Sequence, residues 1–488
     1  MSVVARASVP RRPSLAGLAW GLLALGLGVA VTLPEPQLAL LGVLALIAAT
    51  VALIQPLAAL PLLLFAVPFG GLARGGGSDP SSTTTDLSFG AAELLVALLA
   101  AVWLARGVRR HELSVRAGWI AVLVLAMITL ALLSIGYAND KSLAIKESLK
   151  WLELLLALVI VVDLAREVHA TRWVIGAMFV AGAAEASYGA FQFVTDSGPS
   201  TFALQGALRA FGHFDQPNPF AGYLATMLPL AVCMALCRDN PRRFRLLATG
   251  ASALLALGIA LSQSRGAWLG VAVAATCLLL AWSERTRRLL IPLGVGLGVT
   301  LLLALSGVLP ATILDRLSQA VEYFGVFDVR TVEVTSENWA VVERMAHWQA
   351  GWYMFQDHPW LGVGAGNYAD AYASYFIGSW REALGHAHNY YLNMLAELGI
   401  LGGSVLLLLL GVIFRQFGGA LIRSEPQRAH FARALLAGVF GGLIVFCVHN
   451  LFDNLFVHSV NIQIGVLFGL GLLAVDQLKP MGPYRAMP

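Results

Sequence analysis

The sequence predicts an all-α membrane protein with many transmembrane helices. Hydrophobic residues occupy 58% of its 488 positions, and only 12% of its residues are charged. The mean hydropathy is +0.74. A soluble domain must keep its surface wetted, and about a quarter of its residues are charged. Apolar runs of about 20 residues, the length that crosses a bilayer as a helix, recur along almost the whole chain.

Twelve apolar runs are predicted to span the membrane. They are 15–33, 89–105, 117–137, 145–164, 173–194, 219–237, 246–261, 267–282, 289–308, 390–414, 434–450 and 455–475. The first is longer than the core of a signal peptide and has no small-residue cleavage site, so we expect it to be retained as a span. The run 38–69 is interrupted by Pro56 and Pro61. It predicts either two short spans or a hairpin that re-enters the membrane, which gives 14 or 12 spans.

Arginine-rich connections fix the predicted orientation, because short cytoplasmic loops carry an excess of Lys and Arg. Arg6, Arg11 and Arg12 place the N-terminus inside. The other basic connections occupy every second loop: 106–116, 166–172, 238–245, 285–288 and 415–433. The connections predicted to face outward are therefore 137–142, 195–218, 262–266, 309–389 and 449–454. The net charge of +4 is explained by this topology and does not indicate nucleic-acid binding.

This pattern divides the chain into three parts. An N-terminal bundle of about 11 spans covers 1–308, a large extracytoplasmic helical loop covers 309–389, and C-terminal transmembrane helices cover 390–488. Within the loop, helices are predicted over 312–324 and 336–356, the second with Val341, Met345, Trp348, Trp352 and Phe355 on one packing face. The glycines of 362–366 follow no strand, so they predict turns and not a nucleotide-binding loop.

Four basic residues on the outer side are candidates for binding anions. Arg265 and Arg344 could hold phosphate oxygens with the planar fork of a guanidinium. Arg265 could instead reach out to the membrane surface, and Arg344 could be an ordinary surface residue. Lys146 and Lys150 could bind anionic head groups, or form ion pairs within their own helix with Glu147 and Glu153.

Histidines mark the end of the outer loop. His388 directly precedes the predicted start of a span at Tyr390, where the positive end of the helix dipole favours a neutral ring that can accept a proton. His386 and Asn389 flank it, and either imidazole could be the functional one. The sequence has no Asp-x-Asp pair and no His-Glu-x-x-His motif, and its four cysteines all lie in apolar runs. We therefore expect no disulfide, no metal ion and no cofactor.

Taken in order, these segments resemble the O-antigen ligase/polymerase superfamily of bacterial membrane proteins. The resemblance is carried by FGHFDQPNPFA at 211–221, SRGAWL at 264–269, Arg344 followed by PWLGVG at 359–364, and HNYYL at 388–392 followed by AELG at 396–399. It implies a multispanning fold like that of GT-C glycosyltransferases. It also implies that Arg265 and Arg344 hold a diphosphate and that His388 acts on an acceptor hydroxyl. His386, Asn389, Lys146, Lys150 and Asn218 are the predicted substrate contacts.

The function implied is transfer of a glycan from undecaprenyl diphosphate to a lipid or glycan acceptor, without a metal ion. The reaction would take place at the outer face of the bacterial cytoplasmic membrane. We favour an O-antigen ligase acting on lipid A-core or a related surface glycan. The alternatives are a polysaccharide polymerase, which uses the same parts with another acceptor, and a flippase or exporter of lipid-linked glycan. An exporter would need a charged path through the bilayer, whereas the charged candidates here lie at its outer edge.

Overall fold

The computed structural model describes residues 46–69, 90–111, 117–204, 207–214, 216–305, 327–335, 338–424 and 430–479. The predicted span 15–33 and the predicted helix 312–324 lie outside the described residues.

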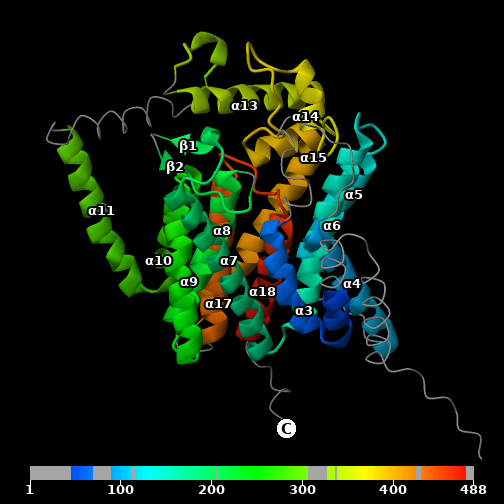
Figure 1. Ribbon diagram of the computed structural model, residues 1–488, viewed down its shortest axis with the longest axis vertical. Helices are drawn as coiled ribbons and strands as arrows, with labels where there is room; N and C mark the ends of the chain where they lie inside the picture. Colours follow the sequence, from blue (N-terminus) through cyan, green and yellow to red (C-terminus); the bar gives the residue numbers. More distant parts are fainter. Residues whose placement is uncertain are drawn as a thin grey trace, which may run out of the picture.

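The described residues form a helical bundle with one very short hairpin (Figure 1). The bundle helices are α3 (Pro56–Ala66), α4 (Ala91–Arg110), α5 (Gly118–Ser134), α6 (Lys141–Leu164), α7 (Val168–Thr195), α8 (Pro217–Leu236), α9 (Arg242–Leu261), α10 (Arg265–Trp282), α11 (Glu284–Leu305), α15 (Tyr390–Ile413), α16 (Gly419–Arg423), α17 (His430–His449) and α18 (Val460–Leu478). The π-helical turn η5 (Phe414–Gly418) joins α15 to α16. The connecting segments contain η2 (Ser200–Phe202), the antiparallel pair β1 (Ala203–Leu204) and β2 (Ala207–Leu208), η3 (Val329–Thr331), α13 (Trp339–Asp357), α14 (Tyr368–Ala371) and η4 (Tyr372–Ser374).

The helices confirm a polytopic membrane protein. Every predicted span other than 15–33 coincides with a described helix, and eight helices are long and apolar enough to cross a bilayer. The total of 12 to 14 spans stays a prediction. Several boundaries differ by up to five residues, and the last helix begins at Val460 and not at Leu455. The side chain of Asn450 accepts a hydrogen bond from the backbone of Leu455, at 2.8 Å, and so holds this stretch as an ordered loop.

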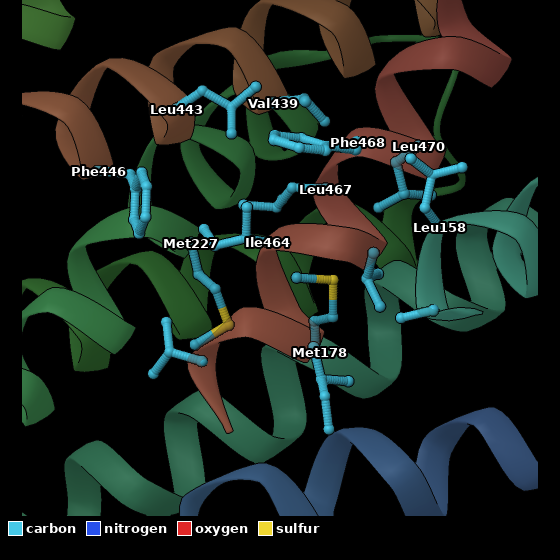
Figure 2. Close-up of a cluster of buried hydrophobic side chains, with 14 of the residues drawn as sticks. Leu158, Met178, Met227, Val439, Leu443, Phe446, Ile464, Leu467, Phe468 and Leu470 are labelled. Atoms are coloured by element: carbon cyan, nitrogen blue, oxygen red, sulfur yellow. The ribbon is translucent and has the colours of Figure 1, made fainter. Parts of the chain in front are cut away.

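The centre of the bundle is built around α17 and α18, which are buried on nearly all sides. Figure 2 shows apolar side chains of five helices meeting there: Leu158 of α6, Met178 of α7, Met227 of α8, Val439, Leu443 and Phe446 of α17, and Ile464, Leu467, Phe468 and Leu470 of α18. Small residues let the backbones approach, as membrane helices require. A Cβ on Gly465 would lie 2.3 Å from the carbonyl oxygen of Leu154 in α6. The C-terminal helices are thus packed into the N-terminal bundle.

The connections lie at two opposite ends of the bundle. At one end, called here the arginine-rich end, Arg172 donates to Asn240 and the ring of His430 lies 3.3 Å from Asp239. These residues come from three of the arginine-rich connections identified in the sequence. At the other end, called here the site end, Arg209 donates to the carbonyl of Ser262 and the backbone of Tyr390 donates to that of Asn450. This alternation of ends agrees with the predicted order of loops.

Helix α13 lies across the site end (Figure 1). It matches the helix predicted over 336–356, but its packing face agrees only in part with the predicted one: Met345 and Trp348 pack as expected. Val342, Ala346, Ala350 and Met354 are buried together with Met345, whereas Trp352 is 45% exposed. Alanines form much of the contact surface. Because their side chains are small, α13 can lie close against α15 and a cluster containing Tyr368. The face predicted from the large aromatic residues is therefore rotated around the helix axis relative to the buried face.

The glycine segment after α13 clamps onto a break in α15. Gly362, Gly364 and Gly366 all have positive φ, which confirms the predicted turns. The backbone N–H of Gly364 donates to the carbonyl of Glu397, at 2.9 Å, and that of Gly366 donates to its carboxylate, at 2.8 Å. Gly399 has a φ of 61° and interrupts α15 at this contact. Two sequence segments that carried the resemblance, 359–364 and 396–399, therefore meet in space.

Candidate active site

Polar side chains from five parts of the chain gather at the site end. Arg265 is the first residue of α10, and Arg344 lies in α13. Arg209 comes from the connection between α7 and α8. His388 directly precedes Asn389, the N-cap of α15, and Asp453 lies in the connection between α17 and α18. No two of these residues are neighbours in the sequence, so the packing of the bundle ends assembles the site.

Backbone and packing contacts hold these elements in place. The side chain of Asn389 caps α15 by accepting a hydrogen bond from the backbone of Leu392, at 3.1 Å. The start of α10 rests on the end of α17, because a Cβ on Gly266 would lie 2.9 Å from the ring of His449. The indole N–H of Trp348 in α13 donates to the carbonyl oxygen of His388, at 3.2 Å. The arginine of α10 and the histidine before α15 are thus fixed relative to one another.

Three arginines form a concentration of positive charge. Arg209 is held by the carbonyl oxygen of Ser262, at 2.7 Å, and the side-chain oxygen of Asn218, at 2.9 Å. Burial and the charges of Arg344 and Arg265 lower the pKa of Arg209 to about 10. Among the described residues, none of the three arginines forms an ion pair with a carboxylate, and the buried Nε of Arg344 has no hydrogen-bond partner. Arginines without carboxylate partners at a membrane surface are suited to bind an anionic ligand.

A histidine–aspartate cluster lies at the start of α15. The Nδ1 atom of His388 is 3.6 Å from Oδ1 of Asp453, and Nε2 of His386 is 3.7 Å from the same oxygen. His347 of α13 faces His388 edge-on, with ring centroids 5.4 Å apart. Within the described part of the chain, both ring nitrogens of His388 and Oδ2 of Asp453 are buried without a hydrogen-bond partner. Such groups are costly in a folded protein and are expected where a ligand completes the site.

The surroundings give these groups different protonation behaviour. Burial and the neighbouring His388 lower the pKa of His386 to about 3. Burial, His388 and His386 likewise lower the pKa of His347 to about 3. Burial alone would raise the pKa of Asp453, but His388, His386 and His449 outweigh it and hold that pKa well below its usual value. His386 and His347 are therefore neutral at physiological pH, and Asp453 is ionised.

The cluster has the composition of a metal site, which the sequence did not predict. One ligand atom from each of His386, His388 and Asp453 lies within 4.8 Å of the others. The hydrogen bonding of His386 opposes this use. Its Nδ1 accepts the backbone N–H of His388, at 3.1 Å, so the proton of the neutral ring belongs on Nε2, the atom that faces Asp453. A histidine that binds a metal needs the opposite arrangement, with a lone pair toward the ion and the N–H turned away.

The remaining predicted contacts occupy different positions. Asn218 orients Arg209, and Asn389 caps α15. Lys150 forms an ion pair with Glu147, at 2.7 Å, which is the within-helix pairing the spacing indicated. Its charge still reaches the cluster, since it contributes to the lowered pKa of His386. Lys146 lies one turn earlier in α6, where its charge helps to lower the pKa of Asp140.

Arg209, His347 and Asp453 were not identified from the sequence. Arg209 and Asp453 do lie in connections that the charge pattern assigned to the outer side, 195–218 and 449–454. The signal available for Asp453 was an acidic residue in a short connection predicted to face outward. His347 gave none, because a histidine on the inner face of an amphipathic helix resembles any other packed residue.

These features define the class: a polytopic helical membrane protein with an arginine- and histidine-lined site at one end of its bundle. Residues 250–407 match the family model described as O-Antigen ligase. The match includes Arg265, Arg344 and His388, and it confirms the resemblance to the O-antigen ligase/polymerase superfamily. Members of this family are ligases and polymerases of the glycosyltransferase type. No curated protein matches the chain significantly.

Proposed function

We propose that this chain is a metal-independent O-antigen ligase. It would move a glycan from undecaprenyl diphosphate to an acceptor at the outer face of the bacterial cytoplasmic membrane. The observation that carries the proposal concerns the described residues. Among them, three arginines at the site end lack carboxylate partners, and the ring nitrogens of His388 have no hydrogen-bond partner. The reaction requires two things: positive charge that stabilises the departing diphosphate, and a base that accepts the proton of the incoming hydroxyl.

The arginines serve the leaving group. As the bond between the anomeric carbon and the diphosphate oxygen breaks, its electron pair remains on the diphosphate, and negative charge grows there. Arg265 and Arg344 donate to those oxygens with planar forks that suit phosphate. Arg209 adds a third charge and is already oriented by Ser262 and Asn218. Such preorganised donors stabilise a transition state without having to reorganise during the reaction.

His388 serves the acceptor. The acceptor hydroxyl attacks the anomeric carbon, and its proton passes to Nε2 of His388. Nδ1 faces the ionised Asp453, which favours the tautomer with its proton on Nδ1 and a lone pair on Nε2. Asp453 is thus a positioning residue. Direct displacement inverts the anomeric centre, and the imidazolium then releases its proton to the diphosphate or to water.

His386 is assigned a supporting role. Its Nδ1 is occupied by the backbone N–H of His388, and its Nε2–H points to Asp453. With its pKa lowered to about 3, it is a weak base. These properties favour His388 as the base and His386 as a residue that anchors the Asp453 carboxylate.

The test is a reconstituted reaction with the full chain in proteoliposomes and EDTA present. The substrates are a glycan linked to undecaprenyl diphosphate and purified lipid A-core. Glycan attached to lipid A-core, with inverted anomeric configuration, is the expected product. Longer carrier-linked chains formed without the acceptor would instead assign a polymerase. Loss of transfer in EDTA and its return with a divalent ion would contradict the metal-free mechanism.

A further inference from the structure

A cavity lies far from the candidate active site, at the arginine-rich end of the bundle. It has a volume of about 600 Å³ and lies between α8, α10 and α17. Its walls are almost entirely apolar, and Val232 and Leu236, which line it, are 40% and 73% exposed. The cavity is therefore open on the side of the bundle. Its size falls within the roughly 300–1,000 Å³ typical of sites for small molecules.

The cavity is as deep as one leaflet of a bilayer. Along α10 its lining extends from Val271 to Trp282. At 1.5 Å per residue this stretch is roughly 16 Å long, about half of the ~30 Å hydrocarbon core. Arg265 lies six residues before Val271 in α10, about 1.7 turns further along the helix, so the cavity does not include the candidate active site. A chain that fills it would come from the leaflet at the arginine-rich end.

Basic side chains stand at the mouth of the cavity. Arg433 lines it and is 3% exposed. Its Nη2 donates to the carbonyl of Trp282, at 2.7 Å, its Nε donates to Ser424, at 3.0 Å, and the guanidinium lies 4.3 Å from the Trp282 ring centroid. Among the described residues it has no carboxylate partner. Arg238, which is exposed, also lines the opening.

The third polar side chain at the mouth, that of His430, is already paired. His430 lines the cavity with its Nδ1 3.3 Å from Asp239, and the second oxygen of Asp239 accepts the backbone N–H of Phe431. The net charge left at the mouth is therefore positive. An apolar slot with a basic mouth at one membrane surface has the character of a site for an anionic lipid.

We propose that this cavity binds one acyl chain of an anionic glycerophospholipid, with the phosphate against Arg433 and Arg238. The apolar walls of α8, α10 and α17 cover the chain, and the two guanidinium groups neutralise the head group. This site does not depend on the glycosyl-transfer assignment. It stabilises the packing of α10 against α17, the two helices that carry Arg265 and His449 to the site end.

Native mass spectrometry of the delipidated full chain tests the proposal. The probes are dioleoyl-phosphatidylglycerol and dioleoyl-phosphatidylcholine at equal concentration. We expect one phosphatidylglycerol to be retained at least tenfold more strongly than phosphatidylcholine. Ala275 is exposed and lines the cavity, so Ala275→Phe fills it without disturbing the core and should abolish this retention. Arg238→Gln should weaken it about fivefold, as expected for one basic residue near a lipid head group.

Two matched variants serve as controls. Ala272→Phe adds the same bulk at an exposed position of α10 outside the cavity, and Arg243→Gln removes an exposed charge at the same end of the bundle. Both should bind phosphatidylglycerol as the unmodified chain does. Equal retention of the two lipids, or unchanged binding in Ala275→Phe, would overturn the proposal. Displacement of phosphatidylglycerol by undecaprenyl phosphate, abolished by Ala275→Phe, would assign the cavity to a polyprenyl tail instead.

Discussion

The Nδ1 atom of His388 and Oδ1 of Asp453 lie 3.6 Å apart, across the junction between α15 and the connection from α17 to α18. This is slightly longer than a hydrogen bond of about 2.7–3.2 Å. Catalytic contacts of this kind are often long before the substrate binds and shorten in the reacting complex. The pair therefore has the geometry of a base and its orienting carboxylate, built from two segments that the bundle brings together.

The first prediction concerns the base. His388→Ala should lower glycan transfer by about 10²- to 10⁴-fold, the usual contribution of a general base, while His386→Ala should be milder. Asp453→Asn should lower the rate less than His388→Ala does.

The measurements are initial rates from pH 5 to 9 with purified donor and acceptor, together with donor affinity determined separately. Unchanged donor binding in His388→Ala would place the loss in the chemical step. Full activity of His388→Ala, or a larger loss in His386→Ala, would contradict the assignment of the base.

The second prediction concerns the anion site. Arg265→Ala and Arg344→Ala should each lower transfer by about 10²- to 10³-fold, the effect of removing one donor that stabilises charge in a transition state. Arg209→Ala should also weaken transfer, and Asn218→Ala should do so to a smaller degree because it releases Arg209. Lysine at 265 or 344 should restore activity only in part, since a point charge cannot bind two oxygens side by side.

Arg330→Ala is the matched control, because Arg330 is an exposed arginine in η3, outside the site, and its loss should leave the rate near that of the unmodified chain. Near-normal rates in Arg265→Ala or Arg344→Ala would leave the diphosphate without its proposed binding group.

Sequence patterns predicted much of this fold because the bilayer imposes a simple rule. A helix that crosses it must be apolar for about 20 residues, and arginines stay on one side. Hence α4 to α11, α15, α17 and α18 coincide with predicted spans. Arg265, Arg344 and His388 could be selected as candidates for the same reason, since the charge pattern places all three at the outer side of the membrane.

The features that could not be predicted from the sequence depend on contacts between segments that lie far apart in the chain. Asp453 becomes part of the site only because α17 ends beside the start of α15, where the backbone of Tyr390 donates to that of Asn450. The break of α15 at Gly399 could not be read from a continuous apolar run, since its cause is the glycine segment that packs against it. The buried face of α13 was predicted only in part. Large aromatic residues such as Trp352 were expected to be buried, and the alanines at 346 and 350 were not.

The third prediction concerns stability and pH. The folded protein lowers the pKa of His347 and His386 to about 3, from an ordinary value near 6.5. At a pH between these two pKa values the unfolded chain binds more protons than the folded chain. The free energy of unfolding must therefore fall as the pH is lowered through 6.5. From pH 7.5 to 5.5 the loss is about 1 kcal/mol for each histidine.

Thermal unfolding in detergent across this range should show the decrease. His347→Gln should flatten the dependence between pH 7.5 and 5.5, whatever its effect on absolute stability. If the unfolding temperature of His347→Gln depends on pH as steeply as that of the unmodified chain, His347 does not cause the loss of stability at low pH.

The last prediction concerns orientation, on which the location of the site depends. Ser379 is exposed beside the site, and Arg243 is exposed at the arginine-rich end. In a variant whose four native cysteines are replaced by alanine, Ser379→Cys should react with a membrane-impermeant maleimide in intact cells. Arg243→Cys should react only after the membrane is opened, because arginine-rich connections stay in the cytoplasm. The opposite labelling would put the arginines and His388 on the cytoplasmic side, where a donor exposed at the outer face could not reach them.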